Sequence, residues 1–190
     1  MKTTMQLPES CRLLQTIDLE KNKRQMIIVN VLAVIVAAAV LAPMLLWAPE
    51  GAAFADDLPE VIVLFVGMLT YVILHEAVHG VCFWAFSGEK PRFGWKSAYA
   101  YAASDAYYPK WPYLTIALAP VVLWGVVLGV LAALLPAQWY WPVQIIQVMN
   151  LSGAAGDLYV TWLLCRMPAD ILVQDAGVAM QVFGQVSDEQ

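Results

Sequence analysis

The sequence predicts an all-α membrane protein with four transmembrane helices, and three observations lead to this prediction. Of the 190 residues, 61% are hydrophobic and only 13% are charged, a balance too apolar for an ordinary soluble domain. The charged residues are segregated, so that long apolar runs remain between them. Each run is long enough to cross the roughly 30 Å of a bilayer's hydrocarbon core as a helix that rises about 1.5 Å per residue.

The expected spans follow one another at about residues 26–47, 61–86, 113–135 and 143–165. They define a transmembrane core over residues 26–165, with an N-terminal segment at 1–25 and a tail at 166–190. The N-terminal segment is a mixed polar stretch, which we expect to be partly helical and to lie at the membrane interface.

The distribution of basic residues predicts the orientation of these spans. Every Lys and Arg falls on one side of a four-span arrangement, and the positive-inside rule assigns that side to the cytoplasm. Both termini are therefore expected in the cytosol, and the lipid bilayer is an expected partner. No basic-aromatic pattern favours binding to nucleic acid. The basic residues are Lys2, Arg12, Lys21, Lys23, Arg24, Lys90, Arg92, Lys96, Lys110 and Arg166.

Two short β-structures are expected on the cytosolic side. The loop after the second span contains Pro91, Gly94 and Pro109, and its aromatic stretch at 93–101 alternates in part, which predicts a hairpin or strand at the interface. Its edge could bind an extended peptide by strand addition, or its aromatic side chains could lie among the headgroups. The tail predicts a second short hairpin over residues 171–183, around a turn at 174–177.

The second span contains the motif His75-Glu76-Ala77-Val78-His79. Residues four apart share one face of a helix, so both imidazoles can reach one metal ion with Glu76 beside them. Adjacent ionisable groups in hydrocarbon are costly unless they bind a ligand or one another. The alternative is a pair of buried histidines bonded to neighbouring carbonyl groups. We favour zinc, and these are the chain's two histidines.

A third ligand is expected from the fourth span, because catalytic zinc usually has three protein ligands and a water. Asp157 lies at about the same depth as the two histidines, roughly 10–16 Å from the cytosolic interface by the rise of a helix. Ser152, Gly153 and Gly156 allow close helix packing nearby. Asn150 lies two turns before Asp157 on about the same face. The alternative for both residues is a polar packing seam between helices.

Several stretches of the chain carry a resemblance to a known family. They are His75-Glu-Ala-Val-His-Gly80, Phe86-Ser-Gly-Glu-Lys-Pro-Arg-Phe-Gly-Trp95, Tyr107-Tyr-Pro-Lys110, Ile116-Ala-Leu-Ala-Pro120, and Asn150 with Gly156-Asp157. With them the chain resembles a bacterial and archaeal family of zincin peptidases, over about residues 7–183. That family is similar to the site-2 proteases, in which H-E-x-x-H on one transmembrane helix and an Asp on a later one bind zinc.

The resemblance implies that His75, His79 and Asp157 are zinc ligands and that Glu76 is the catalytic base. One departure is that site-2 proteases usually place Pro and Gly around the late Asp, whereas Gly156 and Leu158 flank it here. A prokaryotic cell membrane is the implied location.

These features predict a zinc-dependent, membrane-embedded endopeptidase that cleaves membrane-protein or peptide substrates. Metal-activated water would attack the peptide bond with Glu76 as general base, and Asn150 is a weaker candidate for contacting the substrate or its oxyanion. The alternative is a non-proteolytic metal-binding membrane regulator or assembly factor. Substrate identity and oligomeric state are not predicted.

Overall fold

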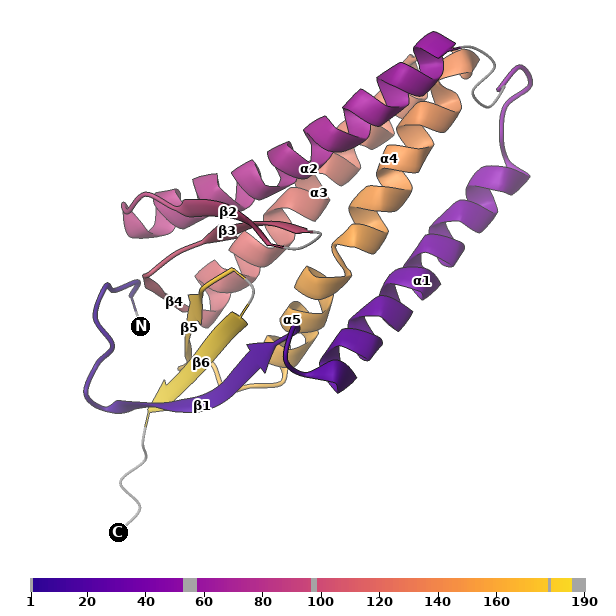
Figure 1. Ribbon diagram of the computed structural model, residues 1–190. Coiled ribbons are helices and arrows are strands. Elements are labelled where there is room, and N and C mark those ends of the chain that lie inside the picture. Colours follow the sequence, from indigo (N-terminus) through magenta and orange to yellow (C-terminus); the bar gives the residue numbers. More distant parts are fainter. Residues whose placement is uncertain (1, 53–57, 97–98, 178, 186–190) are drawn as a thin grey trace. The chain divides into compact units, whose positions relative to one another are not determined.

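The computed structural model describes residues 2–52, 58–96, 99–177 and 179–185, and shows a mostly helical protein with two small antiparallel sheets (Figure 1). The helices are α1 (Lys23–Leu46), α2 (Leu58–Ser87), α3 (Lys110–Leu134), α4 (Tyr140–Gly153) and α5 (Ala155–Cys165). The strands are β1 (Cys11–Asp18), β2 (Arg92–Lys96), β3 (Tyr99–Ala103), β4 (Tyr107–Pro109), β5 (Leu172–Asp175) and β6 (Ala179–Gln185).

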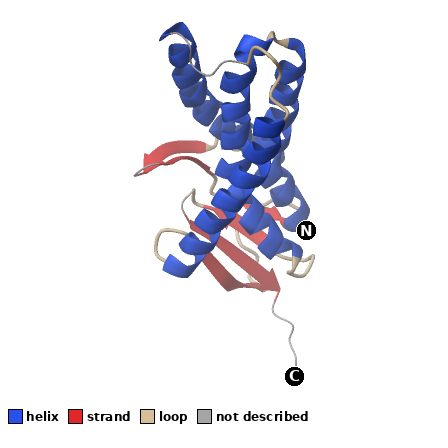
Figure 2. Cartoon of the chain, turned by 90° about the vertical axis from the view of Figure 1, so that its right-hand side faces the viewer, coloured by secondary structure: helices blue, strands red, loops and turns tan. Residues whose placement is uncertain are grey.

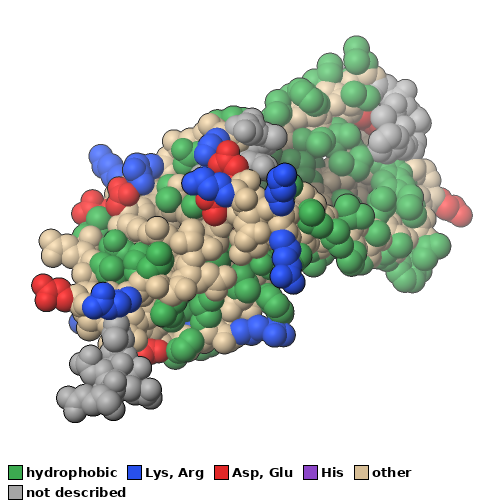
Figure 3. Space-filling view, turned by 60° about the horizontal axis from the view of Figure 1, so that its bottom comes forward, with side chains coloured by type: hydrophobic (Ala, Val, Ile, Leu, Met, Phe, Trp, Pro, Cys, Tyr) green, Lys and Arg blue, Asp and Glu red, His purple; other side chains and the backbone are tan. Residues whose placement is uncertain are grey.

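Three of these helices, α1, α2 and α3, are long and apolar enough to cross a membrane. They correspond to the first three predicted spans. Large apolar side chains remain exposed along them, for example Val34 at 69% and Phe65 at 62%, as expected of helices that face lipid. Hydrophobic side chains form continuous patches on the surface in Figure 3.

The prediction of a single helix over residues 143–165 is wrong, because the chain breaks there into α4 and α5 at Ala154. The local sequence explains the break. The Ser152 hydroxyl donates to the Val148 carbonyl at 2.7 Å, a bond that tends to bend helices, and Gly153 is a poor helix former. By length, α4 covers about 21 Å and α5 about 17 Å, so neither alone crosses the hydrocarbon core.

The chain forms two compact units. One consists of Met1–Ile27, Glu76–Ala119 and Asp157–Gln190 and contains both sheets. The other consists of Ile28–His75 and Pro120–Gly156. All 10 Lys and Arg residues of the sequence belong to the first unit, whereas the charged residues of the second are Glu50, Asp56, Asp57 and Glu60.

Figure 2 shows the strands in red. The larger sheet has the strand order β1-β6-β5-β4, and all its neighbours are antiparallel. The predicted tail hairpin is present as β5 and β6. The expectation of helix in the N-terminal segment is wrong, because that segment forms β1 and pairs with β6, for instance Ile17 with Met180. The pairing gives β6 a second hydrogen-bonded neighbour and buries Ile17, so tertiary pairing decides the structure of a segment with little preference of its own.

The smaller sheet is the predicted hairpin after the second span. Strands β2 and β3 pair antiparallel, with Phe93 opposite Ala102 and Gly94 opposite Tyr101. The hairpin belongs to the same unit as the larger sheet.

Candidate metal centre

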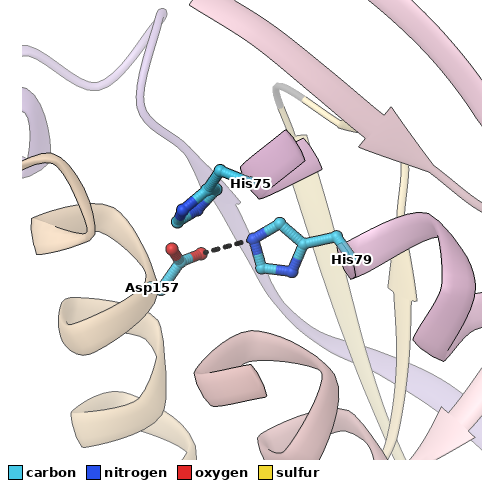
Figure 4. A group of neighbouring side chains, drawn as sticks. All are labelled: His75, His79 and Asp157. Carbon is cyan, nitrogen blue, oxygen red and sulfur yellow. Dashed lines mark ion pairs between the residues drawn. The ribbon is translucent and has the colours of Figure 1, made fainter. Parts of the chain in front are cut away.

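Three predicted ligands come together around one point. His75 and His79 lie one turn apart on α2, and Asp157 lies in the first turn of α5 (Figure 4). Each offers one ligand atom, and these atoms all lie within 4.8 Å of one another. His75 is buried, and the other two residues are half-buried.

The donor set and its spacing fit a tetrahedral zinc ion. Zinc binds imidazole nitrogen and carboxylate oxygen at about 2.0–2.1 Å, so two such ligands of one ion lie about 3.3 Å apart. His79 Nε2 and Asp157 Oδ1 are 3.7 Å apart. Two imidazoles and one carboxylate also match the composition of catalytic zinc sites, in which a fourth position is kept for water or substrate.

The break between α4 and α5 matters to this group because it creates a helix N-terminus next to Asp157. The first turn of a helix carries partial positive charge, which favours a carboxylate. In an uninterrupted helix over 143–165 the same carboxylate would lie mid-helix without this interaction. The break therefore helps to place an anionic group inside an apolar stretch of the chain.

A chain of hydrogen bonds fixes the ring of His75. The Tyr71 hydroxyl donates to Asn150 Oδ1 at 3.0 Å and lies 2.8 Å from His75 Nδ1. The Asn150 amide in turn donates to the Val121 carbonyl at 3.2 Å. Since the one hydroxyl proton goes to Asn150, the hydroxyl accepts from His75 Nδ1–H, which puts the lone pair of that imidazole on Nε2.

His79 has the same tautomer through a different partner. Its Nδ1 lies 3.0 Å from the carbonyl oxygen of Ile116, which can only accept, so Nδ1 carries the proton. Nε2 is then the basic nitrogen, and it lies 3.7 Å from Asp157 Oδ1. Outer hydrogen bonds of this kind are what orient the histidines of metal sites.

Asn150, the candidate for a substrate or oxyanion contact, is held at both ends of its side-chain amide. Its side chain is fully buried, with its oxygen bonded to Tyr71 and its nitrogen to Val121. Asn150 is therefore linked to His75 through the Tyr71 hydroxyl. Tyr71 is not among the residues that the sequence predicts for the site, although its place four residues before His75, on the same helical face, is a signal for it.

Glu76 lies beside His75 on α2 and is half-buried. Its Oε2 accepts a hydrogen bond of 2.8 Å from the backbone N–H of Ala102 in β3. The β2–β3 hairpin therefore contacts the candidate base directly.

Asp175 lies at the end of β5, in the same compact unit as Asp157. The sequence does not reveal the hydrogen bonds of its carboxylate. It accepts hydrogen bonds from the Tyr113 hydroxyl at 2.5 Å and from the Gly177 backbone N–H at 2.8 Å. Burial outweighs these two bonds, which favour the anion, and raises the pKa of Asp175 from 3.8 to about 6.

This shift predicts that replacing Asp175 with Asn changes how stability depends on pH. The folded-state pKa lies above the unfolded value, so the folded protein binds the proton more tightly. The free energy of unfolding of the wild type should fall by up to about 3 kcal/mol through this group as pH rises from about 4 to about 6. Above that pH the group should cause no further fall. Asp175→Asn should lack this loss. Denaturant unfolding of both proteins in nanodiscs between pH 4 and 8 measures the difference, and parallel stability curves would contradict the prediction.

Comparison with known proteins gives one family and one relative. A family model described as "Putative zincin peptidase" matches residues 68–172, a range that holds His75, Glu76, His79 and Asp157. The "Uncharacterized 24.7 kDa protein in gap 5'region" of Pyrococcus woesei is 28% identical over 141 residues, which are 71% of this chain. The aligned part covers 60% of that protein's length. No solved structure matches the chain.

Proposed function

The chain belongs to the "Putative zincin peptidase" family, and from that premise we propose that it is a zinc-dependent, membrane-embedded endopeptidase of the site-2 protease type. The observation that carries the proposal is the meeting of His75, His79 and Asp157 within 4.8 Å. Glu76 stands next to these ligands, on a helix apolar enough to span a membrane.

His75 and His79 would hold zinc through their Nε2 atoms, and Asp157 would hold it through its carboxylate. When bound, zinc supplies Lewis-acid chemistry, because it lowers the pKa of a water molecule and polarises a carbonyl group. Glu76 would take the proton from the attacking water and deliver it to the leaving amine. Tyr71 and Ile116 would keep the two imidazoles in the required tautomer.

We further propose that the chain crosses the prokaryotic cell membrane four times, with α4 and α5 together forming an interrupted fourth span. An interruption at membrane depth is tolerated where it is covered by protein, and Ala154 is fully buried. The restriction of all Lys and Arg residues to one unit supports cytosolic termini, with residues 1–25 and 166–190 on that side. Substrates would then be membrane proteins or peptides.

Metal analysis and cleavage assays on the protein in nanodiscs test the peptidase proposal. We expect about one zinc per chain and cleavage of single-span membrane proteins reconstituted with it. Removal of zinc by 1,10-phenanthroline should abolish cleavage, and zinc but not magnesium should restore it. Zinc binding without cleavage of any substrate in the panel would favour the metal-binding regulator instead. A folded protein that binds no zinc would reject the site.

The hydrogen-bond chain behind His75 predicts that Tyr71→Phe weakens zinc binding. Loss of an outer partner of a metal-bound histidine typically costs about 10- to 100-fold in affinity. The same change leaves His75 Nδ1–H and Asn150 Oδ1 without this bond in a buried place, which should cost about 1–3 kcal/mol of stability. Competition with a chelating dye measures the first effect, and denaturant unfolding measures the second.

Tyr140→Phe is the matched control, because its hydroxyl donates to the Met44 carbonyl rather than to a histidine partner. It should lower stability without changing zinc affinity. Asn150→Ala separates two roles of Asn150. If Asn150 acts through Tyr71, its replacement should weaken zinc binding. If it contacts the substrate, its replacement should alter kcat or KM at unchanged zinc affinity. Equal zinc affinity in Tyr71→Phe and wild type would contradict the positioning role.

A further inference from the structure

The contact between Glu76 and Ala102 involves backbone that the hairpin itself does not use. In an antiparallel pair the N–H and C=O of one residue both point toward the partner strand or both away from it. Ala102 donates to Glu76 Oε2 at 2.8 Å, so this position of β3 points away from β2. The residue is also buried, with 6% of its surface exposed. The bond is therefore an added contact to α2 and costs the hairpin none of its own pairing.

Packing on α2 fixes where this N–H lies. Gly80 follows Glu76 by one helical turn and shares its face. A Cβ at Gly80 would lie 2.3 Å from Cζ of Phe93, so the bare backbone there admits the Phe93 ring. Phe93 is the cross-strand partner of Ala102. Two contacts one turn apart thus set the register of the hairpin on the helix.

The other side of the hairpin is held by the turn between β5 and β6. Gly177 has a φ of +92°, and a Cβ there would lie 2.3 Å from the ring of Tyr101. Ser104, just after β3, donates its N–H to the Asp175 carbonyl at 2.8 Å. The strand that carries the Ala102 N–H is therefore supported both by α2 and by the larger sheet.

We propose that the β2–β3 hairpin positions the general base, with the Ala102 N–H holding one carboxylate oxygen of Glu76. Glutamate has three rotatable side-chain bonds and samples several rotamers unless its end is held. A backbone donor on a supported strand fixes the direction of the carboxylate, and a misplacement of about 1 Å at a reacting group can cost about 100-fold in rate. Ala102 is thus a positioning residue. The role of Glu76 as base rests on the proposed function, whereas the bond itself does not.

Amide hydrogen exchange tests the bond without any cleavage assay. In nanodiscs the Ala102 amide should be protected in the wild type, and Glu76→Ala should lower that protection by about tenfold or more. The Tyr101 amide, one residue earlier and so directed toward β2, should be unchanged. Glu76→Gln keeps an oxygen acceptor and should retain most of the protection. Unchanged protection of Ala102 in Glu76→Ala would overturn the proposal, whether or not the protein proves to be a peptidase.

Proline substitutions test the effect on catalysis. Ala102→Pro removes the donor at a paired position whose N–H makes no hydrogen bond to β2, so the hydrogen bonds of the hairpin are kept. We expect kcat to fall about 10- to 100-fold, with KM and zinc content unchanged. Ala100→Pro is the matched control, because it lies two residues earlier on β3 and removes an N–H of the same direction that does not bond Glu76. It should leave kcat close to the wild-type value.

Ala102→Pro and Ala100→Pro together also distinguish positioning of Glu76 from binding of a substrate strand. A substrate strand added to β3 would use the outward N–H groups of both Ala100 and Ala102. An equal rise in KM for both variants, with kcat unchanged, would therefore overturn the proposal. If Ala102→Pro does not fold, as judged by its zinc content and unfolding temperature, the exchange experiment decides alone.

Discussion

Glu76→Gln is expected to slow cleavage by about 10²- to 10⁴-fold while zinc remains bound. Glutamine has nearly the same shape and keeps an oxygen that can accept from Ala102, but an amide does not take up a proton near neutral pH. General acid–base catalysis typically contributes about 10²- to 10⁴-fold, so kcat should fall by that factor, which is about 3–5 kcal/mol of barrier. Single-turnover cleavage of a reconstituted membrane substrate and metal analysis of the same sample measure the two quantities.

The matched control is Glu89→Gln. Glu89 lies just after α2 and is exposed, so the change removes the same charge without touching the metal group. Cleavage and zinc content should both stay at wild-type values. Equal rates for Glu76→Gln and wild type would show that Glu76 is not the base, and loss of zinc from Glu76→Gln would show that its carboxylate contributes to binding.

The elements set by local pattern could be predicted from the sequence. Apolar runs of spanning length give α1, α2 and α3, because helices in lipid satisfy their own backbone groups. The turn residues around 174–177 and the aromatic stretch at 93–101 give the two hairpins. The spacing of His75 and His79 places both rings on one face of a helix without any tertiary information.

The elements set by distant contacts could not be predicted in the same way. β1 pairs with β6, which lies about 160 residues later, so nothing near β1 reveals its partner. The sequence pattern around Ser152 and Gly153 indicates close helix packing, whereas in the structure their effect on backbone hydrogen bonding breaks the helix. The sequence makes Asn150 a candidate for a substrate contact, and it does not show that Tyr71 and Val121 bond both ends of the Asn150 amide.

Asp157→Ala is expected to weaken zinc binding by more than about 100-fold and to abolish cleavage. Loss of a hydrogen-bond partner of a metal ligand alone lowers metal affinity by about 10- to 100-fold. Asp157 would be bonded to the metal itself, so its loss should have a larger effect. His75 and His79 would remain as a two-ligand set, which is too few for a catalytic zinc site. Competition titration with a chelating dye gives the affinity. Asp170→Ala is the control, because Asp170 is an exposed carboxylate of the same unit, and it should bind zinc as the wild type does.

Two further substitutions at this position separate a ligand from a merely electrostatic neighbour of His79. Asp157→Asn keeps the shape and removes the charge, whereas Asp157→Glu keeps the charge and moves it by one methylene group. A coordinating carboxylate needs both charge and position, so both variants should lose zinc affinity, and Glu should retain more of it because a carboxylate still binds zinc strongly. If the charge acted only through the macrodipole of α5 and the imidazole, Asp157→Glu would bind zinc like the wild type. Wild-type zinc affinity in Asp157→Ala would instead exclude Asp157 as the third ligand and leave the metal on α2 with a donor from elsewhere.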